Sequence, residues 1–291
     1  MSDLEHTASL LPTTRRGWLA LLARLDVRPS KGRGQNFLFE RGVVSRIASI
    51  ASVGAEDVVV EVGPGLGILT EELLRRAGTV IAIELDGRLA GHLRETFGHL
   101  RAFQLIEGDA LRLGVAEIVP LGRDYHVVAN LPYSIAAAVI RHFLEQEQPP
   151  TRITVMVQQE VAERIVATPP EMSILSVAAQ FYASARIAFL VPPSVFIPPP
   201  KVHSAVVILD TLSTPRLPLS DHAAFFRLVN AGFRHKRKQM VNSIAFEIDQ
   251  PKEDVSAWLA STEVDPTRRA QTLSVDEWVS LAKSAPMAWL S

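Results

Sequence analysis

A glycine-rich segment carries the strongest chemical signal in this chain of 291 residues. It spans Glu61–Gly67, with the sequence EVGPGLG, between an expected strand and an expected helix. Glycines at such a junction let the backbone turn tightly and approach a ligand at the helix N-terminus. Position 68 is isoleucine, where a dinucleotide-binding fingerprint has glycine or alanine. The segment predicts a ligand loop and argues against NAD or FAD. The alternative is a tight turn that binds nothing.

Polar side chains follow the next three expected strands. Glu84 ends the second strand, Asp109 follows the third and Asn130 ends the fourth. Ligands of open α/β sheets bind at the carboxyl ends of the strands, and an acid about 20 residues after the first glycine accepts hydrogen bonds from both ribose hydroxyls. Either acid alone is compatible with a helix cap. Together these residues predict a nucleoside site.

The tetrapeptide Asn130–Tyr133, NLPY, has the chemistry to activate an exocyclic amine. Such an amine is a poor nucleophile because its lone pair is delocalised into the base. The Asn130 carboxamide oxygen and the Leu131 carbonyl are suited to accept its two hydrogens, and Pro132 favours an exposed carbonyl because it lacks an N–H. Tyr133 offers a face on which a flipped-out base stacks. The alternative is an ordinary turn after a strand.

The elements that must position these residues alternate between strand and helix. We expect strands over 58–62, 79–84, 102–107, 126–130 and 152–158, with helices over 66–77 and 86–97. This alternation predicts a parallel sheet covered by helices on both faces. After a further helix over 174–182, strands over 186–191 and 204–209 are expected to close the sheet with an antiparallel edge.

The two ends of the chain have a different character. The first 33 residues are basic and contain a helix expected over 17–25. Residues 211–220 contain two prolines and no periodicity, which indicates a linker. Helical patterns follow over 225–233, 240–248, 255–259 and 275–282. We therefore expect a small, all-helical C-terminal domain.

Composition excludes several classes of site. The chain has no cysteine, which excludes disulfides, cysteine-bound metals and cysteine nucleophiles, and no metal-ligand pattern is present. No apolar run is long enough for a membrane span, and the N-terminus does not read as a signal peptide. We expect a cytoplasmic protein with no metal and no membrane partner.

The net charge of −1 does not predict a nucleic-acid partner, so any such affinity must come from a local cluster. The densest basic run contains Arg234, Lys236, Arg237 and Lys238. It is suited to the phosphates of structured RNA. The alternative is a solvated surface.

Several motifs in one order resemble the ribosomal RNA adenine N6,N6-dimethyltransferase family of class I S-adenosylmethionine-dependent methyltransferases. They are GQNFL at 34–38, the glycine loop, GDA at 108–110, NLPY and VFIPPPKV at 195–202, and the resemblance runs from about Arg28 to Ala245. The resemblance implies S-adenosylmethionine as cofactor. It places Gly63 and Gly65 at the methionine part, Glu84 at the ribose and Asp109 at the adenine amine. It also places Asn36 and Leu38 against the cofactor and Phe196 over the target base, opposite Tyr133.

The resemblance also implies a fold and a substrate. The fold is a Rossmann-like sheet with helices on both faces and a small helical C-terminal domain. The implied organisation is a basic extension over 1–33, a catalytic domain over 34–212 and an RNA-recognition domain over 213–291. One branch of the family dimethylates two adjacent adenines near the 3′ end of small-subunit (16S) ribosomal RNA. GPGLG and Leu131 favour that branch. The implied setting is a pre-ribosomal particle, with the enzyme as a monomer.

Two alternatives remain at this point. The first is the other branch, which methylates an adenine of large-subunit (23S) ribosomal RNA and confers antibiotic resistance. The second is a non-catalytic RNA- or DNA-binding factor on the same fold, against which the intact NLPY tetrapeptide argues.

Overall fold

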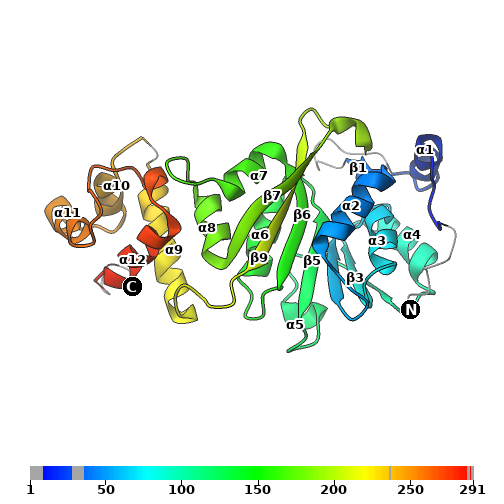
Figure 1. The fold of residues 1–291 in the computed structure, drawn as a ribbon, viewed down its shortest axis with the longest axis horizontal. Coiled ribbons are helices and arrows are strands. Elements are labelled where there is room, and N and C mark those ends of the chain that lie inside the picture. Colours follow the sequence, from blue (N-terminus) through cyan, green and yellow to red (C-terminus); the bar gives the residue numbers. More distant parts are fainter. Residues whose placement is uncertain (1–8, 28–35, 236, 287–288, 290–291) are drawn as a thin grey trace. The chain divides into compact units, whose positions relative to one another are not determined.

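The computed structural model describes residues 9–27, 36–235, 237–286 and 289 (Figure 1). The chain forms two compact units. The first unit comprises Met1–Ala162 and Arg186–Thr211, and the second comprises Glu163–Ala185 and Leu212–Ser291. The chain therefore enters the second unit, returns to the first and leaves it again near residue 212.

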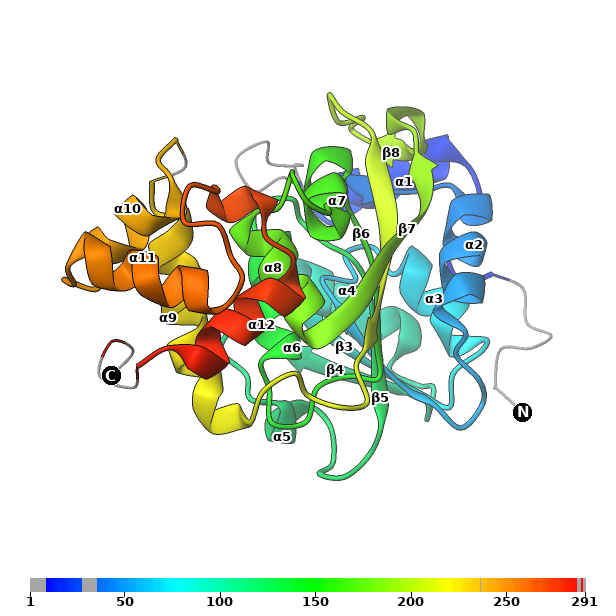
Figure 2. The ribbon, with the colours of Figure 1, turned by 60° about the vertical axis from the view of Figure 1, so that its left-hand side comes forward.

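The first unit is built on a seven-stranded mixed sheet, which Figure 2 shows from a second direction. Its strands, in spatial order, are β4 (Phe103–Glu107), β3 (Thr79–Glu84), β2 (Val58–Val62), β5 (Tyr125–Asn130), β6 (Arg152–Gln158), β9 (Ser204–Thr211) and β7 (Ala183–Val191). The pairs from β4 to β6 are parallel, and β9 pairs antiparallel with β6. This confirms the expected antiparallel strand. The strand order reverses between β2 and β5, which is where such sheets bind ligands.

Successive residues of a strand point to opposite faces of the sheet, and here both sets are apolar. Helices therefore cover both faces. On one face, α1 (Arg15–Arg24), α2 (Arg41–Ala51), α3 (Ile68–Leu74) and α4 (Gly87–Phe97) share one core with the strands. Val59, Ala82 and Val128 contribute to that core. The intervening residues face α6 (Ala136–Leu144), where Phe143 packs on Tyr125 with ring centroids 6.5 Å apart. The short α5 (Val115–Ile118) precedes β5.

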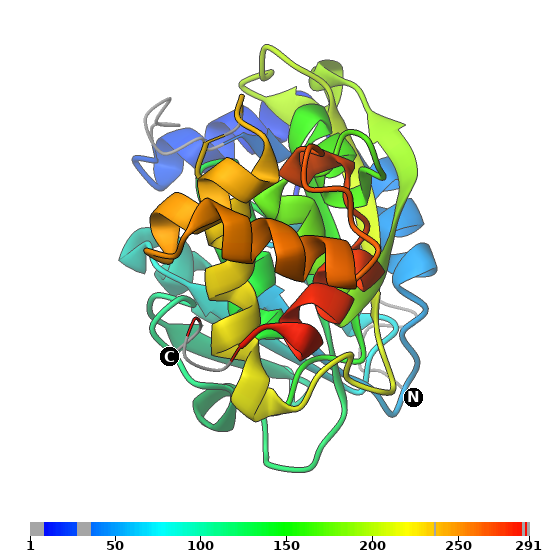
Figure 3. The same cartoon turned by 90° about the vertical axis from the view of Figure 1, so that its left-hand side faces the viewer.

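The second unit is helical and has its own core. It contains α8 (Ile174–Tyr182), α9 (His222–Phe233), α10 (Met240–Glu247), α11 (Lys252–Ser261) and α12 (Val275–Ser284), and Figure 3 shows α9 in yellow, α11 in orange and α12 in red. Phe225, Ile244 and Trp278 are fully buried in this core. A Cβ on Gly232 would lie 2.4 Å from Cη2 of Trp278, so α9 approaches α12 closely only because this residue is glycine.

This division differs from the sequence-based boundaries in two respects. Trp18, Leu21 and Leu22 of α1 are buried in the core of the first unit, although residues 1–33 were expected as an extension. The segment 163–185 belongs to the helical unit, although the expected boundary was near residue 213. Met172, Val177 and Phe181 explain this, because their side chains pack in the core of that unit.

Candidate active site

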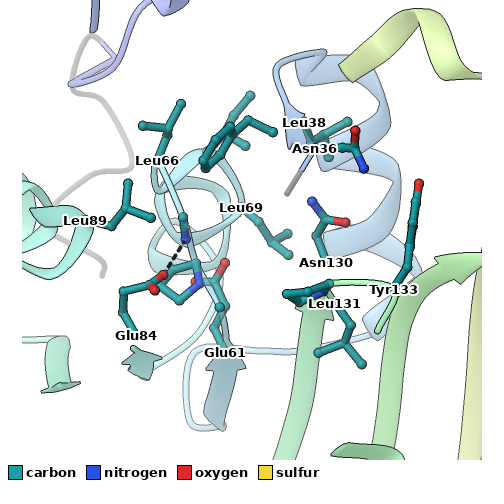
Figure 4. A pocket seen from close by; sticks show the side chains of 16 residues that line it. Asn36, Leu38, Glu61, Leu66, Leu69, Glu84, Leu89, Asn130, Leu131 and Tyr133 are labelled. Carbon is teal, nitrogen blue, oxygen red and sulfur yellow. Dashed lines mark hydrogen bonds between the residues drawn. The ribbon is translucent and has the colours of Figure 1, made fainter. Parts of the chain in front are cut away.

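A pocket lies at the carboxyl end of the sheet in the first unit and gathers most of the predicted site residues (Figure 4). These are Asn36, Leu38, Gly63, Gly65, Glu84, Asn130, Leu131, Pro132 and Tyr133. They come from β1 (Phe37–Leu38) and its preceding residue, the glycine loop, and the ends of β3 and β5. The parallel strands bring these ends together because each strand runs toward the same edge of the sheet.

The glycine loop needs glycine for two separate reasons. Gly63 and Gly65 have φ of +66° and +60°, a left-handed conformation that other residues rarely adopt. A Cβ on Gly65 would also lie 3.3 Å from the Phe37 ring at the edge of the pocket. Gly67 is also left-handed, with a φ of +84°, and it serves packing as well, because a Cβ there would lie 2.6 Å from Cε2 of Phe97 on α4. The first two glycines thus shape the ligand side of the loop, and the third lets the loop pack on the core.

Glu84 connects the glycine loop to the end of β3. Its side chain is 6% exposed. Oε2 accepts a hydrogen bond of 3.1 Å from the Gly65 N–H, and Oε1 accepts one of 2.9 Å from the Asp86 N–H. Burial raises the pKa of Glu84, and these two N–H donors oppose that rise. Each carboxylate oxygen has a second lone pair with which to accept a hydrogen bond from a ligand.

A second cavity, of about 580 Å³, adjoins the first and contains the predicted Asp109. The two cavities share Gly63, Glu84 and Pro132. Oδ1 of Asp109 accepts a hydrogen bond of 3.0 Å from the Leu111 N–H, so this acid also orders the turn after β4. Leu85 lies in the same wall with 70% of its surface exposed. An exposed leucine beside a polar cavity offers an apolar surface to a flat ring.

Glu61 is a site residue that the sequence analysis did not single out. It is 1% exposed and lines the pocket, and no described residue hydrogen-bonds to its Oε2 atom. Burial raises the pKa of Glu61 to about 8; the Thr70 side chain opposes that rise, and the nearby Glu84 carboxylate adds to it. A buried carboxylate oxygen without a hydrogen bond is costly unless a cation or donor meets it. The available signal was an acid within VVVEV, an otherwise apolar strand.

The tetrapeptide after β5 is held by backbone and side-chain contacts. The Leu131 N–H donates to the Met156 carbonyl on β6 at 3.2 Å, and the Ile135 N–H donates to the Pro132 carbonyl at 3.1 Å. The Tyr133 and Ser204 hydroxyls are hydrogen-bonded at 2.8 Å. Figure 4 shows Asn130 and Tyr133 side by side in the pocket wall, near Asn36. Burial raises the pKa of Tyr133.

Phe196 is placed differently from the other predicted residues. It lies in β8 (Phe196–Ile197), which pairs antiparallel with β1, so that Phe196 is opposite Leu38. Its side chain is 2% exposed and belongs to the core of the first unit. The ring is therefore covered by protein in this structure, and its stacking on a target base remains a prediction.

The basic run lies in the second unit, between α9 and α10. Arg234, Arg237 and Lys238 are exposed, and Lys236 lies outside the described residues. Nε of Arg234 is 3.8 Å from Oε1 of Glu247, with 71% of the arginine side chain exposed. Such an exposed pair is weak, so the arginine remains able to contact other anions.

A strand order that reverses beside a glycine loop, with an acid at the end of the next strand, forms a nucleoside site, and with the antiparallel β9 the sheet agrees with the class I S-adenosylmethionine-dependent methyltransferases. Residues 29–286 match the ribosomal RNA adenine dimethylase family. The chain belongs to that family.

Similar proteins agree with this assignment. Ribosomal RNA small subunit methyltransferase A of Dehalococcoides mccartyi strain 195 is 43% identical over 282 residues, covering 96% of this chain and 97% of that protein. The protein with the same name from Moorella thermoacetica is 40% identical over 279 residues, covering 91% and 96%. Among solved structures, the 23S rRNA methyltransferase ErmE has a TM-score of 0.68 at 27% identity, covering 86% of this chain and 99% of that one. A dimethyladenosine transferase from Plasmodium falciparum shares the fold, with a TM-score of 0.71 at 24% identity over 84% of this chain and 95% of that one.

In the part of the chain that the structure describes, no helix is long and apolar enough to cross a membrane. The same residues contain no cluster of three or more histidine, aspartate or glutamate side chains placed to hold a metal ion.

Proposed function

We propose that this enzyme dimethylates the N6 amino groups of two adjacent adenines near the 3′ end of small-subunit ribosomal RNA. One observation carries the proposal: the amine-activating tetrapeptide Asn130–Tyr133 lines the same pocket as the glycine loop and Glu84. An acceptor amine and a nucleoside cofactor would therefore meet in one place. The relatives named above as small-subunit methyltransferases support the choice of RNA.

The residues of the pocket fit S-adenosylmethionine. The buried Oε2 atom of Glu61 lacks a partner among the described residues, and the cofactor carries an ammonium group that matches it. Gly63 and Gly65 leave room for the methionine part, and Glu84 is suited to hold the ribose hydroxyls. In the adjoining cavity, Asp109 and the exposed Leu85 are suited to the adenine amine and ring. The cofactor supplies an electrophilic methyl group on a sulfonium.

Asn130 and Leu131 act on the acceptor amine. The Asn130 carboxamide oxygen and the Leu131 carbonyl accept its two hydrogens, which withdraws the lone pair from the ring and directs it toward the methyl group. The Tyr133 ring provides a surface on which the flipped-out base stacks. No charged base is required before attack, because the amine becomes acidic once it is methylated and then releases a proton to solvent. In the second transfer the monomethylated amine has one hydrogen left for these acceptors. The chain therefore acts mainly by positioning.

We also propose the setting in which the enzyme acts. We expect the enzyme to act as a monomer in the cytoplasm, on RNA in a pre-ribosomal particle, with Arg234, Arg237 and Lys238 contacting phosphates. Lys236 is expected to join them.

The test is methyl transfer by the purified protein to small and large ribosomal subunits from cells that lack the corresponding modification. Mass spectrometry of nuclease fragments should find two dimethylated adenines near the 3′ end of the small-subunit RNA. The Asn130→Ala variant is the control for catalysis by this pocket. Methylation of the large-subunit RNA instead would assign the other branch of the family, and RNA binding without transfer would indicate a non-catalytic factor.

A further inference from the structure

The second unit contains a cavity of about 230 Å³ with a cationic rim. Its walls come from the start of α8, the end of α9 and the short helix η4 (Ala270–Thr272). We propose that this cavity binds one splayed-out nucleotide of the RNA substrate, with the base inside and the phosphate at the rim. The inference rests on the proposed function, because it names a second contact with the same RNA.

The inner part of the cavity is apolar and is built from buried side chains. Phe233 is 7% exposed and Met172 is 4% exposed, and both line the cavity. The Phe233 ring packs on Trp278, which does not line the cavity, with ring centroids 5.8 Å apart. An aromatic ring and a thioether form a surface on which any nucleobase packs favourably.

The cavity wall is also fixed by hydrogen bonds. The Met172 N–H donates to the Gln271 carbonyl at 3.0 Å, which joins the start of α8 to η4. Ser173 caps α8 by accepting a bond of 3.2 Å from the Ser176 N–H. The bond to Met172 holds the Gln271 backbone beside α8, and Gln271 is one of the residues that line the cavity. An amide both donates and accepts, so it matches the edge of a base.

The rim supplies the positive charge. Arg164 and Lys238 are exposed, and neither makes an ion pair with another described residue. The neighbouring Arg234 and His235 differ from these two cations, because each lies within 4 Å of the Glu247 carboxylate. Two such cations at the mouth of an apolar cavity match the charge arrangement of a nucleotide, whose phosphate stays in water while its base is buried.

The size of the cavity selects the ligand. A volume of about 230 Å³ is below the 300–1,000 Å³ of most small-molecule sites, so it is suited to one base rather than to a complete cofactor. Sequence-specific RNA recognition uses such unpaired bases, stacked on aromatic rings and hydrogen-bonded at their edges. The cavity would therefore recognise a nucleotide other than the adenine that is methylated.

The first test compares variants that change either the wall or the rim. Gln271→Ala alters no charge, and Arg164→Ala and Lys238→Ala each remove one cation from the rim. Lys252→Ala is the matched control, because Lys252 is an exposed cation of α11 in the same unit and does not line the cavity. We expect Gln271→Ala, Arg164→Ala and Lys238→Ala each to weaken binding of small-subunit particles by about fivefold, the loss expected for one polar contact of about 1 kcal/mol. Lys252→Ala should weaken it by less than about twofold. Unchanged thermal melting and cofactor affinity would show that the variants are folded.

The second test locates the base directly. Ultraviolet crosslinking of the full chain to small-subunit RNA, followed by mass spectrometry, should place adducts on Met172 or Phe233. The competing surface is Phe246, which is 72% exposed with its ring 5.5 Å from that of His235. Adducts on Phe246 together with normal RNA binding by Gln271→Ala would overturn the cavity as the binding site.

The same experiments separate this inference from the proposed function. If the wild-type protein transfers no methyl groups to small-subunit RNA, the proposed function fails and the cavity loses its stated ligand. If the wild type methylates that RNA and the cavity variants bind it as Lys252→Ala does, only the cavity inference fails. Weaker binding by Gln271→Ala with adducts on Met172 or Phe233 supports both.

Discussion

The hydroxyl groups of Tyr133 and Ser204 lie 2.8 Å apart and join the loop after β5 to the first residue of β9. Ser204 is fully buried, and burial also raises the pKa of Tyr133. The bond thus anchors the far end of an aromatic ring that lines the pocket. Ser204 is consequently a positioning residue for the ring on which the target base is proposed to stack.

This pair yields a prediction for three variants. Tyr133→Ala removes both the ring and its anchor, and stacking is worth roughly 1–3 kcal/mol, so methyl transfer should fall by about tenfold or more. Tyr133→Phe and Ser204→Ala each remove only a bond worth about 1 kcal/mol. They should therefore have similar and smaller effects.

The measurement is single-turnover methyl transfer by the three variants and by the double variant Tyr133→Phe/Ser204→Ala. If the bond is what matters, the double variant should be no worse than either single one. Fully additive losses would mean that the two hydroxyls act independently.

Glu61 yields a prediction about pH. Its pKa in the folded protein, about 8, lies above its ordinary value of 4.5, because burial disfavours the charged form. As the pH rises from about 4.5 to 8, the unfolded chain loses this proton and the folded chain keeps it. Stability therefore falls over that window. Glu61→Gln should remove this dependence, so its melting temperature should rise relative to wild type as the pH increases.

Glu61 should also make cofactor affinity depend on pH, with affinity rising over the pH range in which stability falls. A cationic ligand favours the ionised carboxylate, so wild-type affinity for S-adenosylmethionine should increase as the pH rises toward about 8, by at most about tenfold per unit. Glu61→Gln should bind more weakly, with little pH dependence. Titration calorimetry at a series of pH values on both sides of this pKa measures both. Equal affinities for the two proteins near that pKa would remove Glu61 from the site.

Periodic and local features were predictable from the sequence. The β-branched runs 58–62, 79–84 and 152–158 became strands with the expected bounds, because a strand buried on both faces must be apolar throughout. The glycine loop and the residues after the strands lie in one pocket because a parallel sheet places its carboxyl ends at one edge.

Features that depend on tertiary contacts were not predictable in the same way. The pairing of Phe37–Leu38 with Phe196–Ile197 joins two very short strands far apart in the chain, and neither has a periodic signal. That pairing places Phe196 in the core. Whether Oε2 of Glu61 finds a hydrogen-bond donor likewise depends on the residues that pack around β2. Among the described residues none donates to it. The expected helix over 66–77 is shorter, as α3 (Ile68–Leu74): it begins later because Gly67 has a φ of +84°, and it also ends earlier.

Substitutions at two glycines of the loop should have different effects, one mainly on cofactor binding and the other mainly on the stability of the fold. Gly65→Ala introduces a Cβ 3.3 Å from the Phe37 ring and a strained φ of +60°, at the edge of the pocket. We expect cofactor affinity to fall by at least about tenfold, with a modest loss of stability. Gly67→Ala introduces a Cβ 2.6 Å from Phe97 in the core and should destabilise the fold by about 1–3 kcal/mol. Calorimetric binding and thermal melting of both variants would show this contrast, and identical behaviour would contradict it.

Asn130 should contribute more to chemistry than to cofactor retention. Asn130→Ala removes one preorganised polar group from the pocket, and such groups contribute about 10²–10³ to a rate. We expect methyl transfer to fall by at least about 10²-fold and cofactor affinity to fall by much less. Single-turnover rates and calorimetric affinities of the same preparation test this. Equal losses would make Asn130 primarily a cofactor ligand.

The basic run should act through phosphates. Arg234, Arg237 and Lys238 are exposed in the second unit, so replacing all three by alanine should weaken RNA binding without changing cofactor affinity. The slope of log affinity against log salt should flatten by about 0.7–0.9 for each phosphate that is no longer neutralised. Alanine at the exposed cations Arg227, Lys252 and Lys283 removes the same charge from the same unit and serves as the control. The measurement is the RNA affinity of both triple variants across a salt series. If the two variants have the same slope, the basic run is a solvated surface and does not contact phosphates.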